Sequence, residues 1–171
     1  TLSDGQGNTI ATTTYDGNPT AEQQFLRVTE ILFAPAAPSA QELASIPTLG
    51  AFDFEFVELT NTGASPLDIS GTRFVQGISF TFPEPTVLGP GEHIVVVANE
   101  ADFRLRNPGN LNVAGQYTGR LDNDGEQLQI LDTVGENVLE FTYNDSWHDA
   151  TDEDGYSLIM LDPANTPVTD F

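Results

Sequence analysis

At 171 residues the chain is long enough to form one domain whose hydrophobic core needs no disulfide or metal. It has 26 acidic residues against five Arg and no Lys, for a formal net charge of −21, and it has no cysteine. This composition excludes disulfides and thiolate metal sites, and it argues against nucleic acid and anionic membranes as partners, since phosphate binding relies on Lys and Arg. No apolar run reaches the roughly 20 residues of a membrane helix, so no membrane insertion is expected. The negative electrostatic field of such a chain favours solubility, tolerance of high salt and the binding of divalent cations.

Residues 1–22 are polar, rich in Thr and interrupted by Gly. The segment TIATTTY (9–15) alternates weakly and could form one strand, and DGNP (16–19) is a turn signal. We therefore predict a linker or the last strand of a preceding domain over 1–22, followed by a single domain over 23–171. Because the first residue is Thr rather than Met, we expect a mature fragment or a piece of a longer protein.

From residue 25 onward, short β-branched and aromatic runs alternate with turn residues. This pattern predicts strands in the runs 25–33, 52–61, 67–75 (broken by Gly71), 78–83, 87–99, 114–121, 126–132, 133–145 and 156–163. Asp124-Gly125 predicts a hairpin between the strands on either side of it, and Gly135-Glu136-Asn137 predicts another.

Two short helices interrupt the strands. Ser39 and Glu42 form a capping box that opens a helix over about 39–46, which Pro47 ends. Asn99 caps a second helix over about 99–106. Two helices of this length are too short and too few to serve as crossovers, so we predict an all-β fold, a sandwich or barrel, rather than an α/β fold.

Several fragments in order carry a family resemblance: VTEILFAP, FEFVELTNTGASPLDISGTRF, ISFTFPEPTVLGPGEHIVVVAN, YTGRLDNDGEQLQILDTVGENVLEFTYNDSW and DGYSLIMLDP. Together they span about residues 25–163, and they resemble the lamin tail domain as it occurs in bacterial surface proteins. The resemblance implies an immunoglobulin-like β-sandwich, in agreement with the strand pattern. It also implies an accessory module of a large secreted or surface protein with no catalytic residues to carry over. The association of animal members with nucleic acid is not expected here, because this chain is so poor in basic residues.

Enzyme motifs are missing: the sequence has no Gly-x-Ser-x-Gly elbow, no His-Glu-x-x-His helix and no phosphate loop. Of the two histidines, His93 is expected to be exposed, and His148, beside Asp149, is the one plausible acid–base group. Glu55 and Glu58 could suggest a glycosidase pair, but their spacing along a strand places them on opposite faces. One of the two should face inward and would then need an Arg or a backbone donor.

The acid-rich stretch WHDATDEDGYSLIM (147–160) has two interpretations. Asp149, Asp152 and Asp154, with backbone carbonyls, could bind calcium, although an EF-hand register would place Ala150 and Leu161 at ligand positions. The interpretation we favour is a structural corner with the acids in water. In that corner Trp147 covers the sandwich end and Gly155 turns the chain. Leu158 and Met160 are buried, and Tyr156 could extend the same face.

The preferred function is a non-catalytic, extracellular structural or interaction module of a larger bacterial surface or secreted protein. Its partner would be a protein or glycan at the cell surface. The alternative is a calcium-stabilised carbohydrate- or protein-binding module that uses loops at one end of the sandwich. A stand-alone enzyme is a third hypothesis, for which the sequence offers no firm motif.

Overall fold

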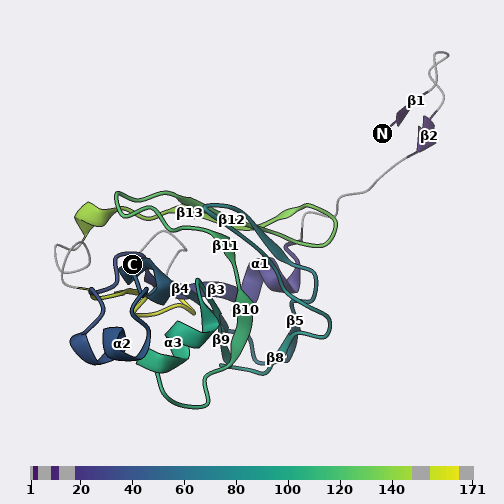
Figure 1. Cartoon of the computed structure of the whole chain (residues 1–171). Helices are drawn as coiled ribbons and strands as arrows, with labels where there is room; N and C mark the ends of the chain where they lie inside the picture. The colour runs from purple at the N-terminus through teal and green to yellow at the C-terminus, as the bar shows by residue number, and fades with distance from the viewer. Residues whose placement is uncertain (1, 4–8, 12–17, 148–154, 166–171) are drawn as a thin grey trace.

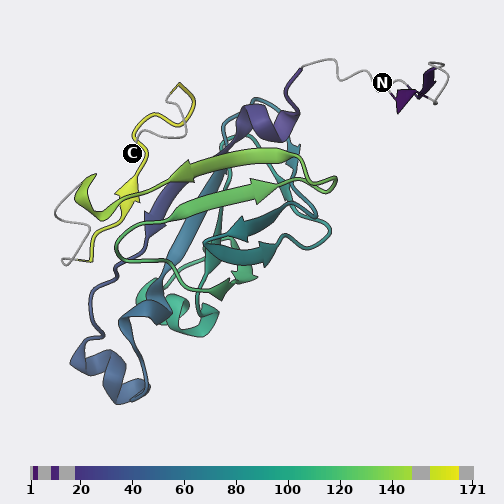
Figure 2. The same cartoon turned by 90° about the horizontal axis from the view of Figure 1, so that it is seen from above.

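The computed structural model describes residues 2–3, 9–11, 18–147 and 155–165, with side chains from residue 18 onward. Its main body consists of two five-stranded sheets packed face to face, as the two perpendicular views show (Figures 1 and 2). The predicted all-β, immunoglobulin-like sandwich is confirmed. The N-terminal stretch forms a small antiparallel hairpin, β1 (Leu2–Ser3) with β2 (Thr9–Ala11). The predicted division between residues 22 and 23 falls inside a short helix, α1 (Ala21–Phe25), and stays a prediction.

The first sheet is built around β3 and β4, which are the longest of its strands. In spatial order its strands are β10 (Val113–Gln116), β9 (His93–Val97), β4 (Phe56–Asn61), β3 (Leu26–Leu32) and β14 (Leu158–Ile159). Alternate residues of these strands point into the sandwich, which is why Val57 and Leu59 are fully buried while Phe56 and Glu58 lie on the outer face.

The second sheet contains the hairpin predicted at Gly135, which joins β12 to β13. Its order is β11 (Thr118–Gly119), β7 (Ile78–Thr81), β6 (Arg73–Gln76), β12 (Gln127–Leu131) and β13 (Asn137–Thr142). A two-stranded piece, β5 (Leu67–Asp68) with β8 (Val87–Leu88), closes one end. Gly71, with φ of +72°, turns the chain between β5 and β6, as the predicted break at this glycine required.

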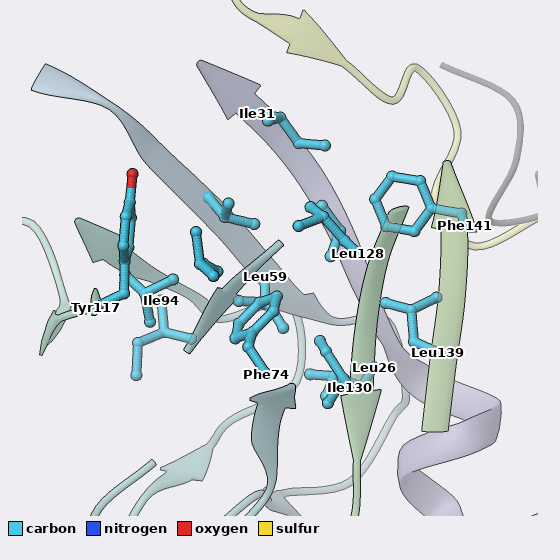
Figure 3. Packing of buried hydrophobic residues seen from close by; sticks show 14 of the residues in the cluster. Leu26, Ile31, Leu59, Phe74, Ile94, Tyr117, Leu128, Ile130, Leu139 and Phe141 are labelled. Carbon is cyan, nitrogen blue, oxygen red and sulfur yellow. The ribbon is translucent and has the colours of Figure 1, made fainter. Parts of the chain in front are cut away.

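The core lies between the two sheets and is filled by side chains from both. Figure 3 shows Leu26, Ile31 and Leu59 of the first sheet meeting Ile130 and Phe141 of the second. Each of these residues is at most 4% exposed. A smaller cluster lies on the outer face of the first sheet, where Phe103 packs on Val95 and Val97. One sheet is therefore buried on both faces over part of its area.

Both predicted helices form, and the structure contains further helical segments that were not predicted. α2 (Ala40–Ser45) has the expected capping box of Ser39 and Glu42, and α3 (Glu100–Arg106) is capped by Asn99. The expectation that helix is confined to these two segments was wrong, because α1 and two 3₁₀ turns, η1 (Ala51–Phe54) and η2 (Asp145–Trp147), also form. Two predicted strands are shortened as a result: β3 begins at Leu26 rather than 25, and β4 at Phe56 rather than 52.

The prediction that no helix serves as a crossover was also wrong. β9, α3 and β10 follow one another along the chain, and β10 pairs parallel with β9, so α3 connects two parallel neighbours. Phe103 explains how so short a helix can connect two parallel strands, because it packs the helix onto the outer side of the sheet. The centroids of the Phe103 and Phe56 rings lie 5.5 Å apart, with the rings edge to face.

The hairpin predicted at Asp124-Gly125 does not form, although the turn does. The Gly125 N–H donates to the carbonyl of Asp122 at 3.2 Å, and Gly125 has φ of +102°. The strands on either side pair elsewhere, β11 with β7 and β12 with β6 and β13. The chain crosses from the first sheet to the second at Tyr117, between β10 and β11, and this turn follows that crossing, between β11 and β12 of the second sheet.

Candidate functional site

A buried carboxylate organises the corner where the chain passes between the sheets. Glu55, just before β4, is 1% exposed. Its Oε2 accepts hydrogen bonds from the Leu121 N–H and the Tyr117 hydroxyl, both at 3.0 Å. Its Oε1 accepts one from Nε of Arg120 at 3.3 Å. The prediction that Glu55 and Glu58 face opposite ways, with the inner one needing an Arg or a backbone donor, is confirmed.

The environment of Glu55 disfavours its charge in part and supports it in part. Burial raises the pKa of Glu55, while the hydrogen bonds from Leu121, Tyr117 and Arg120 act in the opposite direction. Burial beside this carboxylate also raises the pKa of Tyr117 above its ordinary value, so its hydroxyl stays a donor. Glu55 thus joins β4 to the β10–β11 crossing through three donors.

The loop after Leu121 is held by a second set of hydrogen bonds. Glu126 Oε1 accepts from the Asp122 N–H at 3.0 Å and from the Tyr143 hydroxyl at 3.3 Å, and Tyr143 also reaches the carbonyl of Asp122 at 2.8 Å. A Cβ on Gly125 would lie 2.5 Å from the carbonyl oxygen of Tyr143, so only glycine fits there. Burial raises the pKa of Glu126. The loop is therefore fixed from beneath while its outer surface faces solvent.

This corner carries an open depression of about 420 Å³. Charged and amide side chains dominate its lining, which comprises Arg120, Leu121, Asp122, Asn123, Asp124 and Glu126. The Arg120 side chain is 61% exposed, and its guanidinium carbon lies 5.3 Å from the centroid of the Phe52 ring. Arg120 is thus held at Nε by Glu55 and lies beside Phe52, with most of its side chain exposed at the depression. Guanidinium, carboxylate and amide groups together supply both donors and acceptors.

A polar cluster on the outer face of the first sheet surrounds His93. Its Nδ1 lies 2.8 Å from Oε1 of Glu58 and 2.7 Å from the hydroxyl of Thr60. A catalytic relay needs the carboxylate on one ring nitrogen and the hydroxyl on the other. Here both contacts involve the same nitrogen, so the cluster does not form such a relay. The His93 side chain is 55% exposed, which confirms the prediction that it is exposed.

The same cluster extends to the last strand. Ser157, next to β14, donates to Oε1 of Glu30 at 2.5 Å, and Glu30 is paired in register with Glu58 on β4. Burial raises the pKa of Glu30, the Glu58 charge raises it further, and the Ser157 hydrogen bond and His93 oppose the shift. The hydrogen bond between Ser157 and Glu30 thus links the start of β14 to β3, next to the buried Leu158.

The three carboxylates of the predicted calcium site, Asp149, Asp152 and Asp154, lie outside the described residues, as does His148. Within the described ranges, no group of three or more His, Asp or Glu side chains is arranged to hold a metal ion. None of the helices in the described part of the chain has the length and apolar character to cross a membrane.

The structural corner predicted for residues 147–160 agrees with the structure, where its residues are described, in all but one respect. Trp147 packs against the core, Gly155 turns with φ of +76°, and Leu158 and Met160 are 1% and 4% exposed. The suggestion that Tyr156 extends the buried face was wrong, because it is 64% exposed. Tyr156 precedes β14, so strand parity does not govern its direction.

A comparison with known protein families identifies the chain. The family model of the lamin tail domain matches residues 19–145, which is most of the chain and contains both sheets except β14. No curated protein matches the sequence.

Proposed function

The chain belongs to the lamin tail domain family, and we propose that it serves as a non-catalytic, extracellular interaction module of a larger bacterial surface or secreted protein. Lamin tail domains are immunoglobulin-like and non-enzymatic. The geometry of His93 is in keeping with a non-catalytic role, because its hydroxyl and carboxylate partners share one ring nitrogen. We assign binding, rather than chemistry, as the role of the domain.

The contact surface that we propose is the corner depression formed by Arg120 and the Asp122–Glu126 loop. The observation that carries this proposal is Glu55, which holds both Arg120 and the Leu121 backbone from a buried position. A loop fixed in this way loses little conformational entropy on binding, which favours affinity for a given set of contacts. The donors and acceptors of the lining suit a hydroxyl-rich glycan or a polar protein surface.

The charge of the molecule narrows the class of partner. A net charge of −21 disfavours a polyanion such as duplex DNA or RNA as the partner. All five Arg residues make hydrogen bonds or ion pairs within the domain, and of the five Arg120 lines the depression. We therefore propose a neutral glycan or an extracellular protein as the ligand.

A glycan microarray and an array of extracellular proteins test the binding role directly. The full chain is compared with Arg120→Ala and Asn123→Ala in the depression, and with Arg104→Ala on α3 as a control. Arg104 forms only an exposed ion pair with Glu100, at 2.9 Å, so its removal should leave the fold intact. We expect binding that falls tenfold or more in the depression variants and is unchanged in the control. Equal binding by all four proteins would refute this contact surface.

The extracellular location is tested separately. An antibody raised against the chain should label intact cells of the native source, and external protease should remove the signal. Labelling that requires lysis would refute the location while leaving the binding surface open to the array experiment.

The alternative is a calcium-stabilised binding module. What favours it is the acidic stretch 149–154, which joins the described part of the chain between Trp147 and Gly155. Oxygen-rich segments of this kind supply calcium ligands.

A further inference from the structure

One triplet in the chain has the sequence of an N-glycosylation acceptor, Asn-X-Ser or Asn-X-Thr with X other than proline. It is Asn144-Asp145-Ser146. A second triplet, Asn18-Pro19-Thr20, has proline at the middle position, which excludes it. Such acceptors are used on the surfaces of secreted proteins. The position of Asn144 in the fold decides whether this sequence is more than a chance occurrence.

Asn144 lies in a turn between two residues that are anchored in the core, and its own side chain is half-buried. The preceding Tyr143 is fully buried, and Trp147, two residues beyond Asp145, packs against the same core. Between these anchors the chain leaves β13 at Thr142 and forms η2. Ser146, the recognition residue of the triplet, is exposed. The triplet therefore reaches the surface at Ser146, while Asn144 and Asp145 are half-buried on a support fixed by the core.

The side chain of Asn144 is already oriented by its own triplet. Its Oδ1 accepts hydrogen bonds from the Ser146 N–H, at 2.9 Å, and from the Ser146 hydroxyl. Its carbonyl oxygen accepts from the Trp147 N–H at 3.3 Å. Among the described residues, Nδ2 of Asn144 has no hydrogen-bond partner, whereas Nδ2 of the buried Asn61 contacts three carbonyls. Within the described part of the chain, Oδ1 is therefore the bonded atom of this side chain, and Nδ2 is the atom that would carry a sugar.

We propose that Asn144 is an N-glycosylation site, with a lipid-diphosphate-linked oligosaccharide as the donor. In the transfer, a bond forms between Nδ2 and the anomeric carbon of the sugar. The bond from that carbon to the diphosphate oxygen breaks, and the lipid diphosphate leaves with the electron pair. Nδ2 loses one proton to a base of the transferase. This inference rests on the extracellular location proposed above.

A glycan at this position would have a structural consequence. Among the described strands β13 is the last of the second sheet, and α1 contacts it through the hydrogen bond from Gln23 Nε2 to the carbonyl of Asn137. The unpaired edge of a sheet can pair with another chain. A bulky, hydrated group two residues after the end of β13 would shield this edge. Asn144 is not among the residues that line the corner depression, but its backbone lies against Gly125 of the same loop, so the glycan would stand beside the depression.

The test is secretion of the full chain from a yeast host, followed by intact-mass analysis of the protein in the medium. We expect an added mass that is removed by a peptide N-glycosidase. The added mass should also be missing from Asn144→Gln and Ser146→Ala. Ser146→Thr preserves the acceptor sequence and should keep it, which separates loss of the acceptor from loss of the fold.

Secreted wild-type chain without added mass would overturn the proposal, as would added mass that persists in Asn144→Gln. Both outcomes are independent of the cell-labelling and array experiments. An unglycosylated chain that is still found on the native cell surface refutes only this inference. A glycosylated chain that stays inside the native cells refutes only the extracellular role.

Discussion

Asn61, at the end of β4, holds the two neighbouring loops together with one buried amide. Its Nδ2 contacts the carbonyls of Ser65, Leu88 and Gly89 at 2.8 to 3.2 Å, and its Oδ1 accepts from the Gly63 N–H at 2.9 Å. Asn61→Ala leaves these groups unpaired in the interior, so we expect a loss of about 2–3 kcal/mol in the free energy of unfolding. For a domain of this size that is a fall in melting temperature of roughly 4–10 °C.

Differential scanning calorimetry measures this effect, with Asn123→Ala as the matched control. Asn123 is exposed in the corner loop, and its removal should change the melting temperature by no more than about 1–2 °C. Equal melting temperatures for the two variants would show that the Asn61 amide does not contribute as described.

The calcium alternative makes a second prediction at the residue scale. If Asp149, Asp152 and Asp154 only form an acidic turn, EDTA and millimolar Ca²⁺ should leave the melting temperature unchanged. A calcium ion at 100 times its dissociation constant would instead add about 2.7 kcal/mol, a shift of several degrees. A Ca²⁺-dependent rise in melting temperature that disappears in Asp152→Ala would establish calcium binding, against the structural corner that we favour for residues 147–160.

Single residues were predictable where strand parity decided their direction. Parity placed Glu55 and Glu58 on opposite faces, and it placed Leu158 and Met160 together in the core. It could not identify Tyr117, Arg120 or the Leu121 backbone as the partners of Glu55, because they lie more than 60 residues away. Pairings across such a distance depend on sheet order, which local patterns do not contain.

At the scale of elements, β14 is the clearest test of what belongs to the fold. It lies beyond the residues matched by the family model, yet it pairs antiparallel with β3. Leu158 is 1% exposed and belongs to the main core, whereas its neighbour Ile159 is 53% exposed. We expect Leu158→Ala to cost about 2–5 kcal/mol and Ile159→Ala less than about 0.5 kcal/mol.

Urea unfolding followed by tryptophan fluorescence is the measurement for this pair, since Trp147 packs against the same core. Similar midpoints for both variants would mean that β14 is not an integral strand of the sheet. The pair is matched in position and in the removal of a branched aliphatic side chain, so the difference isolates burial.

Elements were predictable where one local signal was sufficient. Ser39 and Glu42 give α2 directly, and the same capping-box pattern, Thr20 with Gln23, marks α1 although it was not used in the prediction. The Asp124-Gly125 turn was predictable but the pairing of its flanks was not. Turn chemistry specifies a reversal of the chain, whereas the strands that pair here, β11 with β7 and β12 with β6, are far apart in the sequence.

At the scale of the whole molecule, burial of carboxylates makes stability depend on pH in an unusual direction. Burial raises the pKa of four carboxyls: Glu30, Glu55, Asp102 and Glu126. A carboxyl whose pKa is raised by folding stabilises the folded state below its unfolded pKa, and this contribution is lost as the pH rises through the folded pKa. Glu42 is the opposite case, since its hydrogen bonds from Arg106 lower its pKa to about 2. Its contribution is present at neutral pH and is lost only as the pH falls toward that value.

We therefore expect the melting temperature to rise as the pH falls from about 7.5 to about 5, and to decline again in more acidic solution. Partial neutralisation of the −21 charge acts in the same direction. Calorimetry at constant ionic strength measures the profile, and Glu55→Gln should flatten its upper part. A melting temperature that falls steadily between pH 7.5 and 5 would contradict this assignment of the buried carboxyls.

The central claim is that the buried carboxylate of Glu55 fixes the corner that the module presents to its ligand. Amide hydrogen exchange over the whole chain tests it most directly, on the wild type, Glu55→Ala and the outer-face control Glu58→Ala. We predict that Glu55→Ala accelerates exchange at Leu121 and in the 122–126 loop by about tenfold or more, corresponding to roughly 1.4 kcal/mol. Exchange in β3 should stay slow, and Glu58→Ala should leave the corner unchanged. Exchange at the corner that is the same in Glu55→Ala and the wild type would contradict the claim.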